Sequence, residues 1–222
     1  MTYNDLKFLV RKGECQTLEF KKKADHPEKI VREMVAFANS GGGQLLIGVE
    51  DNGSIAGLKF PEEEKYVMES ALNFYVKPEI SYNLVIAKTE SGKSVLIYTI
   101  FDGQEKPYYW LTEKGKGTYR AYVRHNDQCL QASTEMLKIL KSVKEVSMKS
   151  FSFTVREKKI FVFLEENKWI NLTQFARISK IPKWLASKIL VQWVLQGILE
   201  IQPGETEDQY SLSASYDPDF YN

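Results

Sequence analysis

The sequence has few cysteines and lacks a long apolar run. Only Cys15 and Cys129 occur in 222 residues, far apart and without Cys-x-x-Cys spacing, which excludes a disulfide framework and a cysteine-based zinc site. No apolar segment approaches the ~20 residues that span a bilayer. The N-terminus also lacks the basic-then-apolar layout of a signal peptide. We therefore expect a cytoplasmic protein with reduced thiols and no membrane partner.

An excess of positive charge is also missing. The chain carries 30 Lys and Arg against 29 Asp and Glu, for a net charge of +1. Residues 1–150 hold 22 basic and 20 acidic side chains, and residues 151–222 hold 8 and 9. Because nucleic-acid-binding proteins concentrate positive charge, such a surface here must be a local patch.

The first 143 residues alternate between helical and extended patterns. Ile30, Met34 and Phe37 recur at helical spacing, whereas Leu18 and Phe20 alternate with polar residues as in a half-buried strand. The expected helices cover residues 4–12, 25–39, a segment after 61, and 134–143. The expected strands cover residues 17–22, 44–49, 79–87, 95–101, 107–111 and 118–124. This order predicts an α+β domain over residues 1–143, with helices packed on a mixed sheet.

The rest of the chain reads as a second, helical domain. Residues 144–152 are polar and weakly periodic, as in a linker, and residues 215–222 form a tail. Three helical patterns followed by a strand pair cover residues 153–214. This arrangement resembles a winged helix-turn-helix, in which the helix beginning at Lys183 would read the DNA major groove. Lys183 and Lys188 are its candidate nucleic-acid contacts.

The wing of this second domain is acidic. The segment Gly204-Glu205-Thr206-Glu207-Asp208 would be repelled by phosphates. A winged helix used for protein contact or for a homodimer is therefore an open alternative to duplex binding.

Several motifs of the first domain occur in a characteristic order. They are Gly-Glu-x4-Glu-Phe-Lys at residues 13–21, Ala-Phe-Ala-Asn-x-Gly-Gly-Gly at 36–43, Ile-Gly-Val-Glu-Asp-x-Gly at 47–53, and Tyr-Val-Arg at 122–124. Together they resemble the Schlafen-type AlbA-like domain, which in bacteria is often described as DNA-binding or as divergent ATP-binding. The resemblance covers about residues 13–136 and makes nucleic acid, DNA or RNA, the expected partner.

Three acidic residues raise the question of catalysis. Nuclease members of the resembled family bind a divalent metal through three carboxylates and cleave RNA, and Glu14, Glu19 and Asp51 (or its neighbour Glu50) occupy the matching positions. Clustered carboxylates repel one another unless a hard cation such as Mg²⁺ or Mn²⁺ neutralises them. The alternative is that Glu19, which is followed by three lysines, belongs to a solvated and mutually paired surface.

Five cations are the candidate phosphate contacts of the first domain. They are Lys21, Lys22, Lys23, Arg120 and Arg124. Their spacing in an extended segment would place both arginines on one strand face, either against nucleic acid or in salt bridges. Aromatic residues interleave with them, and these we expect to fill the core rather than to stack on bases. The aromatic set is Tyr108, Tyr109, Trp110, Tyr119 and Tyr122.

Two glycine-containing segments invite a phosphate-binding interpretation. We expect Gly41-Gly42-Gly43 to form a tight helix-to-strand turn that leaves no room for side chains. Ser91-Gly92-Lys93-Ser94 looks like the end of a P-loop, but Ala87 stands where the first glycine is required and a strand is expected to follow. No ATP site of the P-loop type is supported.

The sequence therefore favours a nucleic-acid-binding protein that acts in transcription regulation. A Mg²⁺- or Mn²⁺-dependent endoribonuclease acting on tRNA or rRNA through Glu14, Glu19 and Asp51 is the alternative from a different class. A protein-interaction module is the third hypothesis, because the net charge is close to zero.

Overall fold

The computed structural model describes residues 2–112, 117–142 and 155–215. Its contacts divide the chain into two compact units, residues 1–131 and residues 132–222. The expected linker at 144–152 and nearly all of the expected tail lie outside the described residues. Within the described part, none of the helices is long and apolar enough to cross a membrane.

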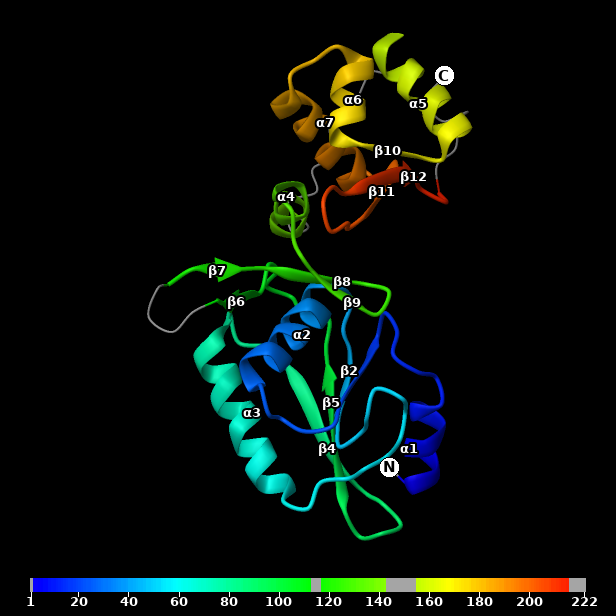
Figure 1. Cartoon of the computed structure of the whole chain (residues 1–222). Coiled ribbons are helices and arrows are strands. Elements are labelled where there is room, and N and C mark those ends of the chain that lie inside the picture. Colours follow the sequence, from blue (N-terminus) through cyan, green and yellow to red (C-terminus); the bar gives the residue numbers. More distant parts are fainter. Residues whose placement is uncertain (1, 113–116, 143–154, 216–222) are drawn as a thin grey trace. The chain divides into compact units, whose positions relative to one another are not determined.

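A four-stranded mixed sheet forms the centre of the first unit (Figure 1). Its strands, in spatial order, are β1 (Leu18–Lys21), β2 (Gly43–Ile47), β5 (Ser94–Ile100) and β4 (Tyr82–Lys88). The β1 and β2 strands are parallel, and the other neighbours are antiparallel. The expected α+β class with a mixed sheet is confirmed.

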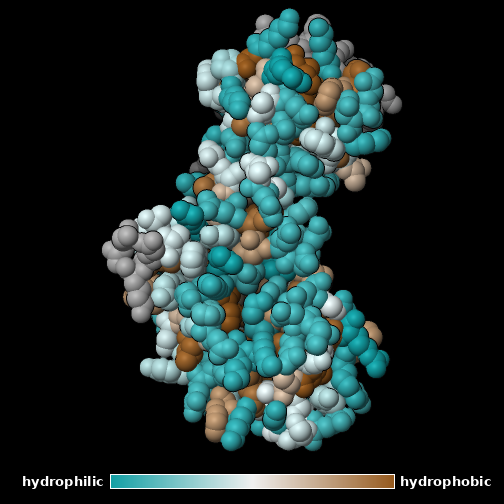
Figure 2. Space-filling model, in the orientation of Figure 1, coloured by the Kyte–Doolittle hydropathy of each residue, from teal (hydrophilic) through white to brown (hydrophobic). Residues whose placement is uncertain are grey.

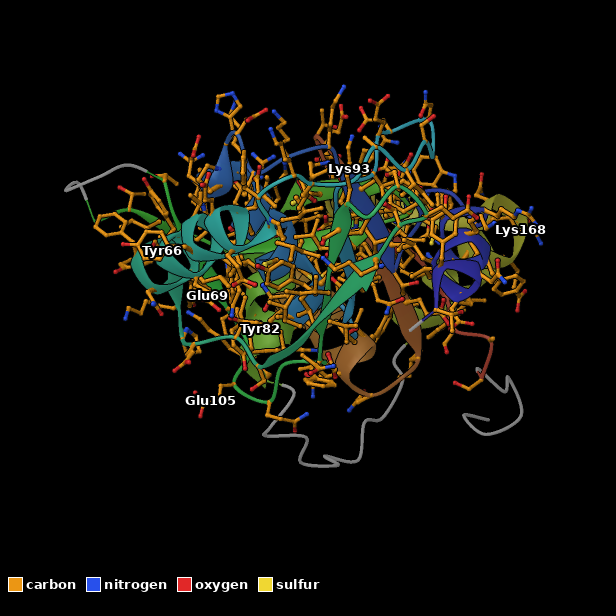
Figure 3. The ribbon with its side chains drawn as sticks, turned by 90° about the horizontal axis from the view of Figure 1, so that it is seen from below. Tyr66, Glu69, Tyr82, Lys93, Glu105 and Lys168 are labelled. Carbon is orange, nitrogen blue, oxygen red and sulfur yellow. The ribbon has the colours of Figure 1, made fainter. Side chains whose placement is uncertain are left out.

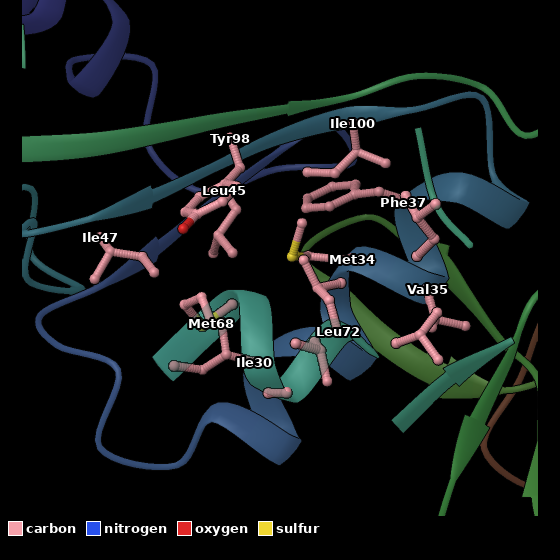
Figure 4. Packing of buried hydrophobic residues seen from close by; sticks show 14 of the residues in the cluster. Ile30, Met34, Val35, Phe37, Leu45, Ile47, Met68, Leu72, Tyr98 and Ile100 are labelled. Carbon is pink, nitrogen blue, oxygen red and sulfur yellow. The ribbon is translucent and has the colours of Figure 1, made fainter. Parts of the chain in front are cut away.

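Side-chain alternation gives this sheet two buried faces. Leu45 and Ile47 of β2 join one apolar cluster, whereas Leu46 between them joins another. The first cluster includes the buried sides of α2 (Pro27–Asn39) and α3 (Pro61–Tyr75), as Figure 4 shows. The second cluster includes Leu6 and Val10 of α1 (Tyr3–Val10). Helices therefore cover both faces, and β2 and β5 are buried on both sides.

The turn between α2 and β2 depends on its glycines. Gly41 and Gly42 have φ values of +91° and +88°, where an L side chain is strained. A Cβ on Gly42 would lie 2.7 Å from the Ile100 carbonyl oxygen. The Gly41 N–H donates to the Asp102 carboxylate and the Gly42 N–H to the Phe37 carbonyl, so neither amide is left to bind phosphate. The expected tight turn is confirmed.

The P-loop-like segment is part of a β-hairpin. Residues 91–94 close the connection between β4 and β5, and a strand rather than a helix follows, as expected. The Lys93 side chain lies at this turn (Figure 3) and donates to the Ala56 carbonyl oxygen.

Two smaller sheets complete the first unit. One contains β3 (Val76–Lys77), β6 (Tyr109–Leu111) and β7 (Tyr119–Arg120), and the other is a hairpin of β8 (Tyr122–His125) and β9 (Gln128–Gln131). The single strand expected at 118–124 is thus two strands, separated at Ala121, that pair with different partners. The β8–β9 hairpin was not expected from the sequence. Asn126, with φ of +55°, lies in its turn.

The second unit contains four helices and a three-stranded sheet within the described residues. In chain order they are α4 (Thr134–Ser142), α5 (Val155–Asn167), β10 (Trp169–Asn171), α6 (Leu172–Ser179), α7 (Lys183–Leu195), β11 (Leu199–Gln202) and β12 (Gln209–Leu212). The sheet order is β10-β12-β11, with antiparallel pairs. The three helices and the hairpin expected for 153–214 are present, and β10 adds a strand to them.

The boundary between the units differs from the expected one. We assigned the helix at 134–143 to the first domain, but α4 belongs to the second unit, which begins at residue 132. Its side chains explain this: Glu135 and Lys138 of α4 both bond to Ser187 of α7.

Candidate functional site

Glu14 lies in the loop that precedes β1 and is half-buried. Its Oε1 accepts the Phe20 backbone N–H at 2.9 Å. Burial raises the pKa of the Glu14 carboxyl, and the negative charges of Glu19 and Asp51 add to this effect, while the Phe20 N–H and Lys21 oppose it. Of the three carboxylates expected from the sequence, Glu19 and Asp51 thus both act on the Glu14 carboxyl.

Glu19 does not face solvent. It is buried in β1, with one carboxylate oxygen paired to the Lys21 ammonium and the other 2.9 Å from Nη1 of Arg124. The strand that we expected to be half-buried is buried at Leu18, Glu19 and Phe20 alike. The charge of Glu19 is thus compensated inside the protein.

Arg124 lies at the centre of this buried network. Its Nη1 is 2.9 Å from both Glu19 and Glu33, its Nη2 donates to the Cys15 carbonyl oxygen at 2.9 Å, and its guanidinium lies 4.7 Å from the Phe37 ring centroid. Only 3% of the residue is exposed. The expectation that Arg124 is an exposed phosphate contact on the same face as Arg120 is therefore wrong. Of the two alternatives that the sequence left open, the salt bridge describes Arg124, although it is internal.

Glu33 is the member of the network that sequence analysis missed. It belongs to α2, where 8% of the residue is exposed. Burial raises the pKa of its carboxyl; the charge of Glu19 adds to this, and Arg124 and Arg32 oppose it. Its sequence position held a signal, since Glu33 comes three residues after Ile30 and four before Phe37, on the apolar stripe of the helix.

The arrangement does not fit a three-carboxylate metal site. Within residues 2–112, 117–142 and 155–215, no three His, Cys, Asp or Glu side chains are grouped as metal ligands. The cause lies in Glu19, whose two oxygens are bonded to Lys21 and Arg124, so a cation would have to displace both. Asp51 is exposed in the turn after β2.

The remaining candidate cations of the first unit differ in their surroundings. Lys21 is mostly covered and pairs with Glu19, and Lys22 lies 2.7 Å from Glu50. Lys23 is exposed. Arg120 is exposed on β7, where its Nη1 donates to the Gln131 amide oxygen at 3.0 Å. Lys23 and Arg120 are therefore the members of the set that remain open to solvent and carry no ion pair among the described residues.

The aromatic residues divide in the same way. Tyr108 and Tyr122 are buried, and the Trp110 indole N–H donates to the Glu28 carbonyl oxygen at 2.7 Å. Core packing, expected for the whole set, is right for these residues. Tyr119 is 48% exposed and directly precedes Arg120 on β7. Because successive side chains of a strand point to opposite faces, the Tyr119 ring and the Arg120 guanidinium are exposed on the two sides of β7. An exposed ring can stack on a base, and an exposed guanidinium can contact a phosphate.

In the second unit, α7 presents Lys183 and Lys188 to solvent. Trp184, one turn before Lys188, is 70% exposed. Ser187 is buried and bonds to Glu135 and Lys138 of α4. One side of α7 is thus covered and another is open.

The acidic turn between β11 and β12, which we expected to be the wing of a winged helix, is partly folded inward. Asp208 is buried and accepts hydrogen bonds from the Ser133 hydroxyl and the Gly204 N–H, and its burial raises the pKa of its carboxyl. Glu205 and Glu207 remain exposed. Figure 2 shows one face of the molecule, which is mostly hydrophilic with small separate hydrophobic patches.

The first unit is thus an α+β domain with a mixed sheet and a buried arginine–carboxylate network. Residues 14–133 match the protein family described as Schlafen, AlbA_2. The chain therefore belongs to this family. No curated protein matches the chain.

Two solved structures are similar to parts of the chain. The N-terminal domain of a protein from Nitrosomonas europaea, related to the ATP-dependent DNA helicase RecG, is 24% identical with a TM-score of 0.43, over 58% of this chain and 92% of that one. The DIP2311 protein from Corynebacterium diphtheriae is 18% identical with a TM-score of 0.43, over 62% of this chain and 28% of that one. At TM-scores of this size, neither likeness supports a statement about function.

Proposed function

We propose that the protein binds nucleic acid through the exposed strand β7 of its Schlafen AlbA_2 domain. The observation that carries the proposal is the pair Tyr119 and Arg120, an exposed ring and an exposed cation, within a domain of this family. The ring supplies a stacking surface for a base, and the guanidinium supplies a contact to phosphate. Lys23 is a second exposed cation available to the same partner.

Fluorescence anisotropy with labelled single-stranded RNA, single-stranded DNA and duplex DNA tests this proposal. Arg120→Ala should weaken binding and lower the slope of log affinity against log salt by about one, since one phosphate contact is lost. Lys93→Ala is the control, because Lys93 is an exposed cation on a different hairpin. Equal affinity and slope for Arg120→Ala and wild type would contradict the proposal. Absence of binding to all three ligands at low salt would favour the protein-interaction alternative.

A role in transcription regulation is the finer form of this proposal. It requires duplex DNA to bind the open side of α7, where Lys183, Trp184 and Lys188 are exposed. The exposed wing carboxylates Glu205 and Glu207 oppose such binding. If α7 reads a duplex, Lys188→Ala weakens duplex binding more than single-strand binding. If α7 is a protein-contact surface, the two affinities do not change.

The endoribonuclease remains the alternative from a different class. Its support is the proximity of Asp51 and Glu19 to Glu14, which contributes to the raised pKa of Glu14. The ion pairs of Glu19 weigh against it. Incubation of tRNA with Mn²⁺ and either wild type or Glu19→Gln decides the matter. Cleavage that is absent from both, or equal in both, excludes an enzyme that uses Glu19.

A further inference from the structure

A pocket of about 520 Å³ opens beside the loop that carries Glu14. One wall comes from α1 and the residues that follow it, and the opposite wall is the turn after β2. Tyr3, Lys7, Val10 and Arg11 line the first wall, and Asp51, Asn52 and Ile55 belong to the second. The α1 residues precede residue 14, where the family match begins, so the match itself assigns nothing to them.

The two cations of this pocket, Lys7 of α1 and Arg11 directly after it, lie on the same side of the helix. Lys7 and Arg11 are four residues apart, which places their side chains one turn apart on the same face. Arg11 is exposed, and within the described part of the chain its guanidinium has no carboxylate partner. The Lys7 ammonium lies 3.4 Å from Glu90 in an exposed pair and 4.6 Å from the Tyr3 ring centroid. Exposed pairs of this kind are weak, so Lys7 can exchange Glu90 for another anion.

Apart from the Asp51 carboxylate, the remaining lining is apolar or neutral. Val10 and Phe20 are buried at the base of the pocket, and Ile55 is partly buried. In the opposite turn, the Asn52 side-chain oxygen accepts the Ser54 N–H, and the Asp51 carboxylate is exposed. The pocket thus combines two cations, an apolar floor, and amide and carboxylate groups that bond to hydroxyl or amino groups.

We propose that this pocket binds one nucleotide unit, with the phosphate between Lys7 and Arg11 and with the sugar and base against Asp51, Asn52 and the apolar floor. Each part of the pocket has a counterpart in that ligand: an anion, a flat base, and sugar hydroxyls. The volume lies within the range of about 300–1,000 Å³ that is usual for small-ligand sites. The unit is either a free nucleotide or a nucleotide within a nucleic-acid chain.

The test measures both sources on the full chain. Isothermal titration calorimetry with AMP and dTMP examines the free nucleotide, and anisotropy with a labelled single-stranded oligonucleotide examines the chain-bound one. Arg11→Ala should weaken whichever ligand occupies the pocket by about tenfold, the usual loss for one charge-assisted hydrogen bond. Lys7→Ala should weaken the same ligand. Lys12→Ala is the matched control, because Lys12 is the adjacent exposed cation, lies over the Phe8 ring and does not line the pocket.

Each outcome decides a question. Free-nucleotide binding that Arg11→Ala weakens and Lys12→Ala does not supports a free-nucleotide site, and the same pattern with the oligonucleotide alone supports a chain-bound nucleotide. Unchanged affinity of Arg11→Ala for both ligands, or an equal loss in Lys12→Ala, overturns the proposal. If only Arg120→Ala weakens oligonucleotide binding, the β7 interface is supported and the pocket is rejected. If only Arg11→Ala weakens ligand binding, the pocket is supported and the β7 interface is rejected.

Discussion

Arg120 and Arg124 are four residues apart, yet they occupy opposite environments. Arg120 is exposed on β7 and bonds to a neutral amide. Arg124 is buried on β8, between two carboxylates and against an aromatic ring. The same residue type thus lies at the surface in one strand and in a buried ion-pair network in the next.

The difference follows from strand pairing. In one continuous strand, residues 120, 122 and 124 would share a face. Here β7 pairs with β6 and β8 pairs with β9, so the alternation restarts at Ala121. The side chain of Arg124 is then directed at α2, where the Glu33 carboxylate accepts a hydrogen bond from its guanidinium. The backbone N–H of Arg124 donates to the hydroxyl of Ser40, the residue that follows α2.

The largest expected effect is the loss of the buried cation. Arg124→Met should lower the free energy of unfolding by about 3–5 kcal/mol, because Glu19 and Glu33 would remain buried without their shared partner. Urea denaturation at neutral pH measures this change.

A combined variant is the control for this prediction. Replacing Glu19 and Glu33 by Gln in the Arg124→Met background removes the two buried charges that Arg124 shared, so part of the lost stability should return. Equal stability of the single and triple variants would show that the carboxylates do not depend on Arg124.

The next effect concerns ligand binding at β7. Tyr119→Ala should weaken binding of single-stranded nucleic acid by about 1–3 kcal/mol, the usual contribution of one stacked base, and should leave the unfolding free energy nearly unchanged. Tyr66→Ala is the matched control, since Tyr66 is a 72% exposed tyrosine on α3 (Figure 3). Similar losses in both variants would mean that β7 is not the interface.

Much of the first unit could be predicted from local pattern. Each of three elements has a short-range sequence signal. For the strand pair β4–β5 it is the polar turn between two strand-like runs, for helix α2 it is helical periodicity, and for the turn after α2 it is the run of three glycines. The β8–β9 hairpin has a weaker signal, the Asn126-Asp127 turn. No local sequence signal shows that α4 belongs to the second unit. That assignment depends on hydrogen bonds to Ser187, which is distant from α4 in the sequence.

The candidate site was predicted less well than the fold. The motif spacing singled out Glu14, Glu19 and Asp51, and in the structure the charges of Glu19 and Asp51 both raise the pKa of the Glu14 carboxyl. It could not show that Glu19 is neutralised, since that depends on Arg124 from a distant strand. Burial of a charge is a tertiary property: it is tolerated only where a partner from elsewhere in the fold is present.

A smaller effect is the pH dependence of stability that the buried Glu33 carboxyl causes. Burial raises the pKa of Glu33 above its ordinary value of 4.5. At pH values between the unfolded and the folded pKa, the folded protein therefore holds a proton on Glu33 that the unfolded chain releases. Wild type should therefore gain stability relative to Glu33→Gln as pH falls from about 7 through the folded pKa, with no further gain below the unfolded value. Urea midpoints of both proteins across this range measure the difference. A gain for wild type as pH rises would contradict the raised pKa.

The smallest effect completes the comparison of the two arginines. Arg120→Ala should change the unfolding free energy by no more than about 0.5 kcal/mol, because solvent replaces its bond to Gln131 and no buried charge is left behind. The same urea experiment that detects the loss in Arg124→Met measures this. A large loss in Arg120→Ala would mean that β7 is required for folding, and its effect on nucleic-acid affinity would then reflect misfolding rather than a lost contact. If Arg120→Ala leaves the unfolding free energy unchanged and lowers nucleic-acid affinity, Arg120 acts in binding, whereas Arg124, four residues later, acts in stability.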